Sequence, residues 1–569
     1  MPDSLPNRLS GAEAMARMLQ AYDVKHIFGL CGDTSLPFYD ALFRLDHGID
    51  HILTRDERCA AYMADGYARV TNKVGVCEGP SGGGATYIAP GLVEANESSV
   101  PILAINSDVS TTSSGRYPLT ELDQKALFKP LTKWNGVLDN AATLPRMVRT
   151  AFRAMTTGRP GAAHLAFPID VQRAETPTDE VWADEAHKSF PAWPSAPDPA
   201  SVAVAVELIL AAKAPMVVCG GGPVISGAED ELRRFVERLD LPVATSVSGK
   251  GVIAETHPNC LGVVGSNGGC QAATDAVGAA DLVIFIGCRA GSVTTERWSI
   301  PKPGAKIIHI DSDPMVIGAS FDTDVALVGD ARLALAAFNI LLDGLSAGDL
   351  PSGFGGGRVA ARVRDLRGAQ FRSLAGSMDL PIRPERVVDA LNRLLPEESI
   401  VVADPGTPCP YMSAYLTMKR PGRRYITNRA HGALGYALSA AMGAHVGRPE
   451  AKTVSIMGDG SFCFTVGEFE TVVRRNMPIT FIVFSNSVYG WIKAGQKSGF
   501  GERYFSVDFN RTDHAAVAEA FGVKSWKVEQ PGDLDAALSA ALRHDGPSLV
   551  DVISQPLQDA AAPVSEWIA

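Results

Sequence analysis

The segment from Thr453 to Asn486 limits most strongly what this 569-residue chain can fold into. The apolar run Thr453 to Met457 breaks at Gly458-Asp459-Gly460, a helical pattern follows, and a second apolar run ends at Ser485-Asn486. A strand, a turn, a helix and a strand form the repeating unit of a parallel α/β sheet. Ligands bind outside the carboxyl ends of the strands in such sheets, where both Asp459 and Asn486 are expected.

Asp459 and Asn486 offer one carboxylate and one amide oxygen, too few ligands for a metal cage made by the protein alone. The pair suits Mg²⁺, which keeps several waters and takes its remaining oxygens from phosphate groups. The flanking glycines allow the backbone to approach such phosphates closely. A Gly-Asp-Gly triplet by itself is usually only a turn, so the prediction depends on Asn486 at this spacing.

This pattern resembles the signature of the thiamin-diphosphate-dependent enzymes, in which Gly-Asp-Gly is followed after a similar gap by an Asn-containing pair. Members of this family usually have Asn-Asn or Cys-Asn there, so Ser485 is a departure, whereas the ligand position Asn486 is kept. The resemblance implies that Asp459, Asn486 and Val488 bind Mg²⁺. It assigns cofactor contacts to Glu57, Gly406, Thr407, Gly432, Leu434, Gly458, Asp459, Gly460, Ser461, Asn486, Tyr489, Gly490, Trp491 and Ile492.

Glu57 lies at a predicted strand-to-helix junction, where a helix N-terminus holds a carboxylate. Alone it would be read as an acid of the first helical turn. The segment HILTRDERCAAYMADGYARVTN resembles the family's pyrimidine-binding segment, in which this Glu bonds the aminopyrimidine ring. The family needs it because the ring's amino group must shift to its imino tautomer to remove the thiazolium C2 proton.

Two further roles follow from the resemblance, in the segment Asn428 to Gly435. Leu434 is expected to wedge beneath the cofactor and bend it into its reactive shape, although ordinary core packing explains it equally well. The backbone carbonyl of Gly432 is expected to accept a hydrogen bond from the cofactor's amino group.

The resemblance covers essentially the whole chain, whose length suggests about three domains. The expected fold class is α/β, with three doubly wound parallel-sheet domains. They are a pyrimidine-binding domain at 1–190, a Rossmann-like middle domain at 191–357 and a diphosphate-binding domain at 358–554. The apolar tail 555–569, which contains Trp567, is expected to fold over the active site as a lid, with a structural strap as the alternative.

Composition excludes several classes of protein. A net charge of −11 and the lack of a basic face argue against a nucleic-acid or acidic-membrane partner. No 18-residue apolar stretch occurs, and residues 1–14 lack signal-peptide character, which together predict a cytoplasmic protein. The nine cysteines are scattered singly, so neither a zinc site nor a disulfide framework is expected.

The middle domain resembles a sheet that holds FAD in some family members, ADP in others and nothing in the rest. A glycine turn follows the strand Met216 to Cys219, and Asp311 follows another strand. We therefore expect ADP, with Asp311 holding the ribose. The predicted nucleotide contacts are Gly221, Gly222, Arg289 and Asp311.

The choice of reaction depends on the first domain and on the segment Tyr489 to Lys493, which we expect to be a turn. Synthase-like members often carry Phe-Gln-Glu, with the Gln near the reacting carbon, where this chain has Leu119-Thr120-Glu121. The chain more closely resembles the 2-hydroxyacyl-CoA lyase and oxalyl-CoA decarboxylase branch, above all the 2-hydroxyisobutyryl-CoA lyases. The resemblance gives catalytic positions to Glu57, Glu121 and Lys493, and a substrate pocket of Gly32, Asp33, Leu127, Ile492 and Trp567.

The expected reaction is therefore cleavage of an acyl-CoA thioester, a branched 2-hydroxyacyl-CoA, to formyl-CoA and a ketone or aldehyde. CoA phosphates could meet the basic run KRPGRR at 419–424, although such runs are commonly solvated loops. The alternative is an oxalyl-CoA decarboxylase, or an acetolactate-synthase-like decarboxylase or carboligase acting on a 2-oxo acid. A catalytically silent nucleotide-binding subunit is disfavoured because Glu57, Asp459 and Asn486 are all present.

Lys493 is the main departure from a lyase, because that branch is expected to have a carboxylate here as the base for the substrate hydroxyl. An ammonium group is only a donor, so a lysine acts as a base only if its pKa falls well below about 10.4. Family members build each site across two subunits, so the resemblance also implies a homodimer or homotetramer.

Overall fold

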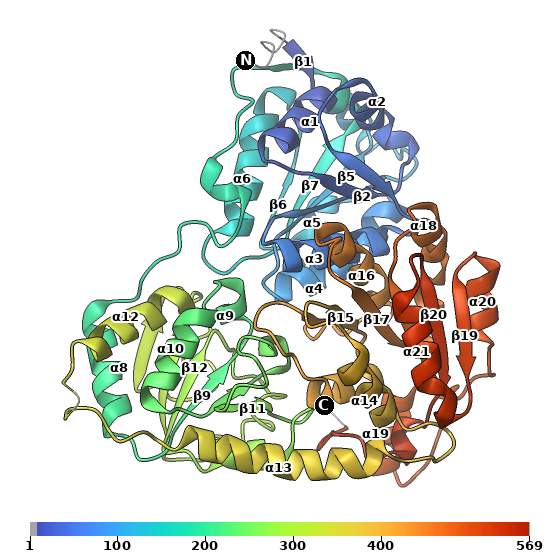
Figure 1. Cartoon of the computed structure of the whole chain (residues 1–569). Coiled ribbons are helices and arrows are strands. Elements are labelled where there is room, and N and C mark those ends of the chain that lie inside the picture. Colours follow the sequence, from blue (N-terminus) through green and yellow to red (C-terminus); the bar gives the residue numbers. More distant parts are fainter. Residues whose placement is uncertain (1–7, 347, 568–569) are drawn as a thin grey trace. The chain divides into compact units, whose positions relative to one another are not determined.

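The computed structural model describes residues 8–346 and 348–567 (Figure 1). The chain forms two compact units. The first comprises Met1–Trp193, Asn428–Glu450 and Thr465–Met477, and the second Pro194–Thr427, Ala451–Phe464 and Pro478–Ala569. Residues 1–7, which belong to the predicted first domain and its N-terminus, and 568–569 of the predicted tail lie outside the described residues.

The prediction of three parallel α/β sheets is confirmed, and each sheet has six strands. In the first unit their order is β3-β2-β4-β5-β7-β6. The strands are β2 (His26–Gly29), β3 (Asp50–Leu53), β4 (Gly75–Gly79), β5 (Ile102–Asp108), β6 (Trp134–Val137) and β7 (Ala163–Pro168). A separate two-stranded antiparallel sheet is formed by β1 (Arg8–Ser10) and β8 (Glu175–Pro177). The helices are α1 (Gly11–Ala21), α2 (Leu36–Arg44), α3 (Glu57–Thr71), α4 (Gly83–Glu97), α5 (Gln124–Phe128), α6 (Leu144–Thr156), α7 (Ile169–Arg173), α16 (Tyr436–Gly447) and α18 (Phe469–Arg474).

The second unit contains the other two sheets, with strand orders β11-β10-β9-β12-β13-β14 and β16-β15-β17-β18-β20-β19. The strands of the middle sheet are β9 (Pro215–Cys219), β10 (Val243–Thr245), β11 (Cys260–Val263), β12 (Leu282–Ile286), β13 (Lys306–Asp311) and β14 (Val325–Val328). Those of the last sheet are β15 (Ile400–Ala403), β16 (Tyr425–Thr427), β17 (Thr453–Gly458), β18 (Thr480–Ser485), β19 (Lys524–Val528) and β20 (Ser548–Ile553). The helices are α8 (Pro199–Ala211), α9 (Gly222–Ile225), α10 (Glu229–Leu239), α11 (Gln271–Gly278), α12 (Ala331–Asp343), α13 (Gly356–Ala375), α14 (Pro384–Leu394), α15 (Pro408–Tyr415), α17 (Asp459–Thr465), α19 (Gly490–Gly499), α20 (His514–Ala520) and α21 (Leu534–Arg543).

Continuous apolar runs in the sequence became central strands, because helices cover both faces of a parallel sheet. Every residue of β9, β12 and β18 is buried. The predicted strands Met216 to Cys219 and Thr453 to Met457 match β9 and β17 to within one residue at each end. No helix within residues 8–346 and 348–567 is long and apolar enough to cross a membrane.

The predicted turn Tyr489 to Lys493 is wrong, because α19 begins at Gly490. A Cβ atom at Gly490 would lie 3.4 Å from the Thr407 hydroxyl oxygen and 3.4 Å from the Leu557 Cβ. Gly490 therefore lies packed at the start of a helix, whereas the sequence pattern suggested a change of chain direction. Similarly, α17 starts at Asp459 directly after β17, without an intervening turn.

In the first unit, α16 packs closely on α3 although the two helices are far apart in the sequence (Figure 1). A side chain at Gly66 would overlap the backbone carbonyl of Ala440, and one at Gly443 would overlap that of Met63. Glycines at these crossings let the two backbones approach. The predicted third domain, 358–554, thus contributes segments to both compact units, and the exact boundaries of the three domains stay a prediction.

Candidate functional site

Asp459 joins the carboxyl ends of two adjacent strands, β17 and β18. Its Oδ2 accepts hydrogen bonds from the backbone N–H groups of Asn486 at 2.8 Å and Ser487 at 2.6 Å. Its Oδ1 accepts from the N–H of Gly460 at 2.8 Å. Burial raises the pKa of this carboxyl, and the three N–H donors oppose that rise. The structure therefore brings together the two residues that the sequence placed at one sheet edge.

The amide of Asn486 lacks a partner in the described part of the chain. Both its Oδ1 and its Nδ2 are buried without a hydrogen bond. Leaving a buried polar group unsatisfied costs about 1–3 kcal/mol, so a ligand that hydrogen-bonds this amide would be favoured here. A pocket of about 340 Å³, lined in part by Asn486, Ser487, Arg511 and Ser554, leaves room beside it.

Asp459 and Asn486 together fit Mg²⁺ bound to a phosphate-bearing cofactor, because they supply two oxygens and leave the rest to waters and phosphate. Among the described residues, no group of three or more His, Cys, Asp or Glu side chains gathers to hold a metal ion. A site completed by ligand oxygens is the arrangement that this donor set allows.

A buried polar network lies directly behind Asn486. The Ser485 hydroxyl is 2.8 Å from Nδ1 of His514 and donates to Oδ1 of Asp551. The backbone N–H of His514 donates to Oδ2 of Asp551 at 3.2 Å. Burial lowers the pKa of His514, but hydrogen bonds to Asp551 and Cys463 outweigh this and raise it to about 9. The sequence showed only Ser485, as a departure from the family, and gave no signal for its partners.

The other residues predicted to bind the diphosphate also gather in the second unit, at the carboxyl ends of β15, β17 and β18. Thr407 lies against Gly490, and the Tyr489 ring covers Gly460, where a Cβ would be 2.9 Å from the ring. Val488 is buried and forms a β-bridge with Asp508. The same loops and helix starts also contain Gly406, Gly458, Ser461, Trp491 and Ile492.

Glu57 is buried at the first turn of α3, 5 % exposed, in the first unit. Its side chain lies against the glycine-rich start of α4 and the end of β4. A Cβ at Gly79 would be 3.0 Å from Cγ of Glu57, and one at Gly84 would be 3.1 Å from Oε1. Burial raises the pKa of Glu57, and the charges of Asp56 and Glu78 raise it further. A carboxyl in this state is suited to exchanging a proton with a ring nitrogen.

The loop that precedes Glu57 is held by a second buried carboxylate, which the sequence analysis missed. Oε1 of Glu468 accepts from the backbone N–H of Arg55 at 2.8 Å, and Oε2 accepts from the Thr471 hydroxyl at 2.8 Å. Burial raises the pKa of Glu468 to about 7. No local pattern marks such a residue, because Arg55, the partner in the loop before Glu57, is more than 400 positions away.

Gly432 and Leu434 belong to the first unit, in a loop fixed from both ends. Oε2 of Glu94 accepts from the backbone N–H of His431 at 2.7 Å, and Asn428 donates to the carbonyl of Ala433 at 2.7 Å. Gly432 has a φ of +71°, which a residue with a side chain rarely adopts. Leu434 is half-buried.

The predicted catalytic Lys493 is engaged within the second unit. Its Nζ lies 2.6 Å from Oδ1 of Asp508 and 4.9 Å from the centre of the Tyr504 ring. The carboxylate accepts a hydrogen bond from this amine, and the aromatic face packs beside it. In this arrangement Lys493 is a donor and holds the segment after α19, which disfavours a role as the general base of a lyase.

The predicted catalytic residue Glu121 and the first-domain residues of the predicted substrate pocket mainly hold their own loops. Oε1 of Glu121 accepts from the Ser114 hydroxyl at 3.0 Å and the Gly115 N–H at 2.7 Å. Asp33 bonds the N–H of Thr34, and Gly32 leaves space for Pro80. Leu127 is half-buried on α5.

The glycines predicted to hold a nucleotide in the middle domain pack on backbone instead. A side chain at Gly222 would contact Gly287, whose carbonyl accepts from the Gly222 N–H at 3.1 Å. Asp311 is the last residue of β13, at the strand end as expected, and its Oδ1 accepts from the N–H of Asp313 at 2.9 Å. The fourth predicted nucleotide contact, Arg289, lies after β12. Apart from the position of Asp311, none of these observations supports ADP binding.

The C-terminal tail is docked along the second unit. Leu557 is buried in the core of the last sheet. The N–H of Gly268 donates to the Pro563 carbonyl at 2.9 Å, and the Trp567 ring meets Trp491 edge-on at 5.1 Å. The tail thus connects the last sheet with the segment after β11, which is the behaviour of a strap. A lid function stays a prediction.

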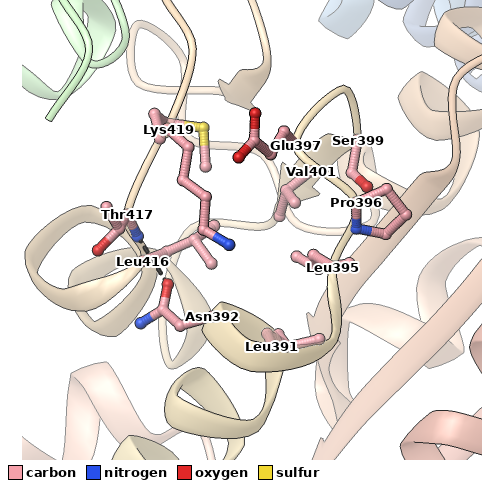
Figure 2. A pocket seen from close by; sticks show the side chains of 11 residues that line it. Leu391, Asn392, Leu395, Pro396, Glu397, Ser399, Val401, Leu416, Thr417 and Lys419 are labelled. Carbon is pink, nitrogen blue, oxygen red and sulfur yellow. Dashed lines mark hydrogen bonds between the residues drawn. The ribbon is translucent and has the colours of Figure 1, made fainter. Parts of the chain in front are cut away.

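The basic run at 419–424 is largely neutralised by neighbouring acids. Arg420 pairs with Glu397 at 3.0 Å, and Arg424 pairs with Glu398 at 2.7 Å. Lys419 lines a small pocket with Asn392 and Glu397, shown in Figure 2. These pairs engage two of the four basic side chains of the run that were predicted to meet CoA phosphates.

The fold is α/β, and this donor set fits a phosphate-bearing cofactor held with a divalent cation. Comparison with known families gives three matches in chain order. They are "Thiamine pyrophosphate enzyme, N-terminal TPP binding domain" at residues 9–127, the central domain at 202–338 and the C-terminal TPP binding domain at 404–552. The chain belongs to the thiamine pyrophosphate (thiamin diphosphate) enzyme family.

Comparison with individual proteins indicates which branch of that family the chain resembles most. The chain is 35 % identical to a probable acetolactate synthase large subunit of Methanococcus aeolicus, over 96 % of this chain and 92 % of the relative. It is 31 % identical to the acetolactate synthase isozyme 2 large subunit of Escherichia coli, over 97 % of this chain and 96 % of the relative. The family prediction is therefore confirmed, whereas the similarity favours the predicted alternative over the acyl-CoA lyase branch.

Proposed function

We propose that this enzyme uses thiamin diphosphate and Mg²⁺ to decarboxylate a 2-oxo acid and to join the remaining fragment to a second carbonyl compound. The observation that carries the proposal is the similarity to acetolactate synthase large subunits along nearly the whole chain. The chemistry that this cofactor supplies when bound is cleavage of a C–C bond beside a carbonyl, with the electrons held in its thiazolium ring.

In the proposed function, different residues of the chain have different roles. Asp459 and Asn486 hold Mg²⁺ against the diphosphate, and the network behind Ser485 orients Asn486. Glu57 exchanges a proton with the pyrimidine ring, and Glu468 keeps the preceding loop in place. Glu94 fixes the loop that carries Gly432 and Leu434.

The acceptor substrate need not be the one used by acetolactate synthases, because the first domain departs from the synthase pattern. Thr120 stands where synthase-like members have Gln, and its hydroxyl is 2.7 Å from that of Ser81. It adopts a φ of +70°, and Leu119 beside it is exposed. We propose that this short side chain leaves room at the reacting carbon for another acceptor.

A 2-hydroxyacyl-CoA lyase, or an oxalyl-CoA decarboxylase, is the second candidate. It is favoured by the same Leu119-Thr120 departure and by exposed Ile492 as a wall for a branched substrate. The ion pair of Lys493 with Asp508 counts against it, since a lyase needs a proton acceptor at that position.

One screen separates the two candidates. Protein loaded with thiamin diphosphate and Mg²⁺ is offered pyruvate and longer 2-oxo acids, with and without aldehyde acceptors, and separately a series of acyl-CoA thioesters. Release of CO₂ and formation of a 2-hydroxy ketone product are expected with 2-oxo acids. Formyl-CoA from a thioester, without turnover of any 2-oxo acid, would replace the main proposal with the second.

Lys493 offers an independent check. Lys493→Glu combined with Asp508→Asn supplies a carboxylate without leaving two acids side by side. If the protein is a lyase, this pair is expected to raise turnover of a branched 2-hydroxyacyl-CoA. Loss of 2-oxo acid turnover in the same pair would make Lys493 a working residue of a decarboxylase or carboligase.

Two further proposals complete the function. We propose a homodimer or homotetramer, which light scattering would measure directly. ADP in the middle domain remains a proposal that rests on the position of Asp311, and release of nucleotide from heat-denatured protein would test it.

A further inference from the structure

Four side-chain hydroxyls form one continuous hydrogen-bonded chain in the first unit. From oxygen to oxygen, Ser107 lies 2.9 Å from Thr34, Thr34 lies 3.1 Å from Ser81, and Ser81 lies 2.7 Å from Thr120. Ser107, Thr34 and Ser81 are buried, whereas Thr120 is exposed. The hydroxyl chain therefore runs from the interior of the unit to its surface.

The hydroxyl chain crosses the sheet edge at which parallel α/β proteins bind their ligands. Thr34 lies in the turn after β2, Ser81 in the turn after β4, and Ser107 near the end of β5. In the sheet, β4 lies between β2 and β5. The carboxyl ends of three adjacent strands thus supply three of the four hydroxyls, which is the usual position of a binding site in this fold.

Thr120, the exposed end of the chain, lies on the glycine turn that also contacts Glu57. A Cβ at Gly82 would be 2.8 Å from Thr120, and one at Gly84 would be 3.1 Å from Oε1 of Glu57. Thr120 has a φ of +70°, which is an outlier for a β-branched residue. Such strain persists only where the surrounding structure imposes it, and it is concentrated at ligand-binding sites.

The direction of the hydroxyl chain follows from its exposed end, because each hydroxyl has a single proton to donate. Thr120 donates to the Leu119 carbonyl at 2.5 Å, so Ser81 is the donor to Thr120. Thr34 is then the donor to Ser81, and Ser107 is the donor to Thr34. Hydrogen bonds that point the same way strengthen one another. The Thr120 hydroxyl is therefore a polarised donor, suited to an oxygen that accepts a hydrogen bond.

The charges around this donor indicate what kind of oxygen it suits. Within residues 8–346 and 348–567, no Lys, Arg or His side chain bonds any of the four hydroxyls. Carboxylate ligands are bound most strongly by such cations. The carboxylate of Glu121 follows Thr120 directly, whereas the nearest basic residues of the loop, Arg116 and Lys125, are four and five positions away. An uncharged carbonyl oxygen therefore fits better than a carboxylate.

We propose that Thr120, polarised by Ser81, binds the carbonyl oxygen of an aldehyde and so selects aldehydes over 2-oxo acids as the second substrate. The proposal deepens the proposed function and rests on it. In the balanced reaction, the electron pair left when CO₂ departs forms the new C–C bond to the aldehyde carbon. The C=O pair moves to the aldehyde oxygen, which takes a proton from solvent and becomes the product hydroxyl. Thr120 donates a hydrogen bond to this oxygen while negative charge develops on it.

The first test asks which second substrate the holoenzyme uses. Protein loaded with thiamin diphosphate and Mg²⁺ is given the 2-oxo acid that releases CO₂ fastest in the screen above, with an equal concentration of acetaldehyde. Wild type is expected to form mainly the 2-hydroxy ketone that contains acetaldehyde. A product made mainly from two molecules of the 2-oxo acid would overturn the proposal.

The second test removes the hydroxyl of Thr120 and keeps the shape of the side chain. Thr120→Val is also β-branched, so both proteins carry the same backbone strain. The variant should raise KM for acetaldehyde about threefold to tenfold, as expected for one lost hydrogen bond to an uncharged oxygen. CO₂ release measured without aldehyde should fall far less. Thr120→Ser, which keeps the hydroxyl, should return KM to within about twofold of wild type.

Two more variants complete the second test. Ser81→Ala leaves Thr120 its proton but removes the donor behind it, so KM for acetaldehyde should rise about twofold. Thr150→Val is the matched control, because its hydroxyl bonds only within α6, and it should leave KM unchanged. A rise in KM for Thr120→Val with a proportional loss of CO₂ release would show that the hydroxyl only holds its loop.

The outcomes separate this inference from the proposed function. Lack of CO₂ release from every 2-oxo acid by wild type would reject the proposed function, and the inference with it. Normal CO₂ release with an unchanged KM for acetaldehyde in Thr120→Val would reject only the role of Thr120.

Discussion

At the scale of single residues, the most informative atoms are buried polar atoms that have no hydrogen-bond partner among the described residues. Asn486 has both amide atoms buried and without partners, whereas Asp459 beside it accepts three backbone hydrogen bonds. Asp459 therefore stabilises the apoprotein as well as any bound metal, and Asn486 serves mainly the ligand. Asn486 is therefore the better probe of the metal site, because its substitution should disturb the apoprotein less.

Asn486→Ala should weaken binding of thiamin diphosphate with Mg²⁺ at least about tenfold while leaving the apoprotein as stable as wild type. The reason is that the substitution removes an unsatisfied amide, which costs the apoprotein nothing and can stabilise it by about 1 kcal/mol. Calorimetric titration and thermal melting measure the two effects. Unchanged cofactor affinity, or a marked loss of apoprotein stability, would contradict the assignment.

Glu57→Gln should retain the cofactor but slow C2 proton exchange by orders of magnitude. Glutamine has nearly the same shape, so the packing on Gly79 and Gly84 persists, but it cannot exchange a proton with the ring. NMR exchange rates on protein with equal cofactor occupancy provide the measurement. An exchange rate equal to that of wild type would remove Glu57 from the mechanism.

At the scale of structural elements, buried carboxylates on one element hold the functional loop of another. Glu94 of α4 is buried, bonds the Ser98 hydroxyl at 2.6 Å, lies 3.5 Å from Arg69, and accepts from the N–H of His431. The loop with Gly432 and Leu434 is therefore fixed by a helix more than 300 residues earlier in the chain.

Glu94→Gln should raise the dissociation constant for thiamin diphosphate about tenfold, because one charge-assisted hydrogen bond to the loop is lost. Ser98→Ala is the matched control, since it removes a bond to Glu94 but leaves the bond to His431. Fluorescence titration of both variants distinguishes them. Equal affinities in the two variants would mean that Glu94 acts only in packing.

His514 of α20 gives a pH-dependent prediction for the network behind β18. Its pKa is raised from 6.5 to about 9 in the folded protein, so its stabilising contribution is complete below pH 6.5 and is lost as pH rises through about 9. The difference in melting temperature between wild type and His514→Asn should therefore shrink between pH 6.5 and 9.5. A difference that stays constant across this range would contradict a charged His514.

At the scale of the whole molecule, the tail connects two sheets of the second unit. Leu557 is buried in the core, Arg297 pairs with Glu566 at 2.7 Å, and Ser565 bonds Glu296. Removing residues 556–569 exposes the core at Leu557, whose burial contributes about 1.5–3 kcal/mol.

Truncation before Pro556 should lower the melting temperature by several degrees, whereas truncation after Asp559, which keeps Leu557, should lower it less. Thermal melting and steady-state kinetics on both truncations separate a strap from a lid. If the shorter truncation keeps its melting temperature but raises KM several-fold, the tail acts as a lid. Unchanged stability in both truncations would reject the strap.

The sequence by itself determined the three parallel sheets, the family and the pairing of Asp459 with Asn486. These follow from local patterns, since apolar runs, glycine turns and strand-end polar residues need only their neighbours. It did not determine the branch, because the contacts of Lys493 with Asp508 and of Thr120 with Ser81 leave no local sequence pattern.

Only the tertiary structure decided which residues support the site. No motif marks Glu94, Glu468 or His514, and their partners lie on other segments of the chain. Likewise, the packing of α16 on α3 depends on glycines whose value is apparent only when a second backbone crosses them. Burial and long-range contact set the protonation of these acids, and neither quantity is encoded in local sequence.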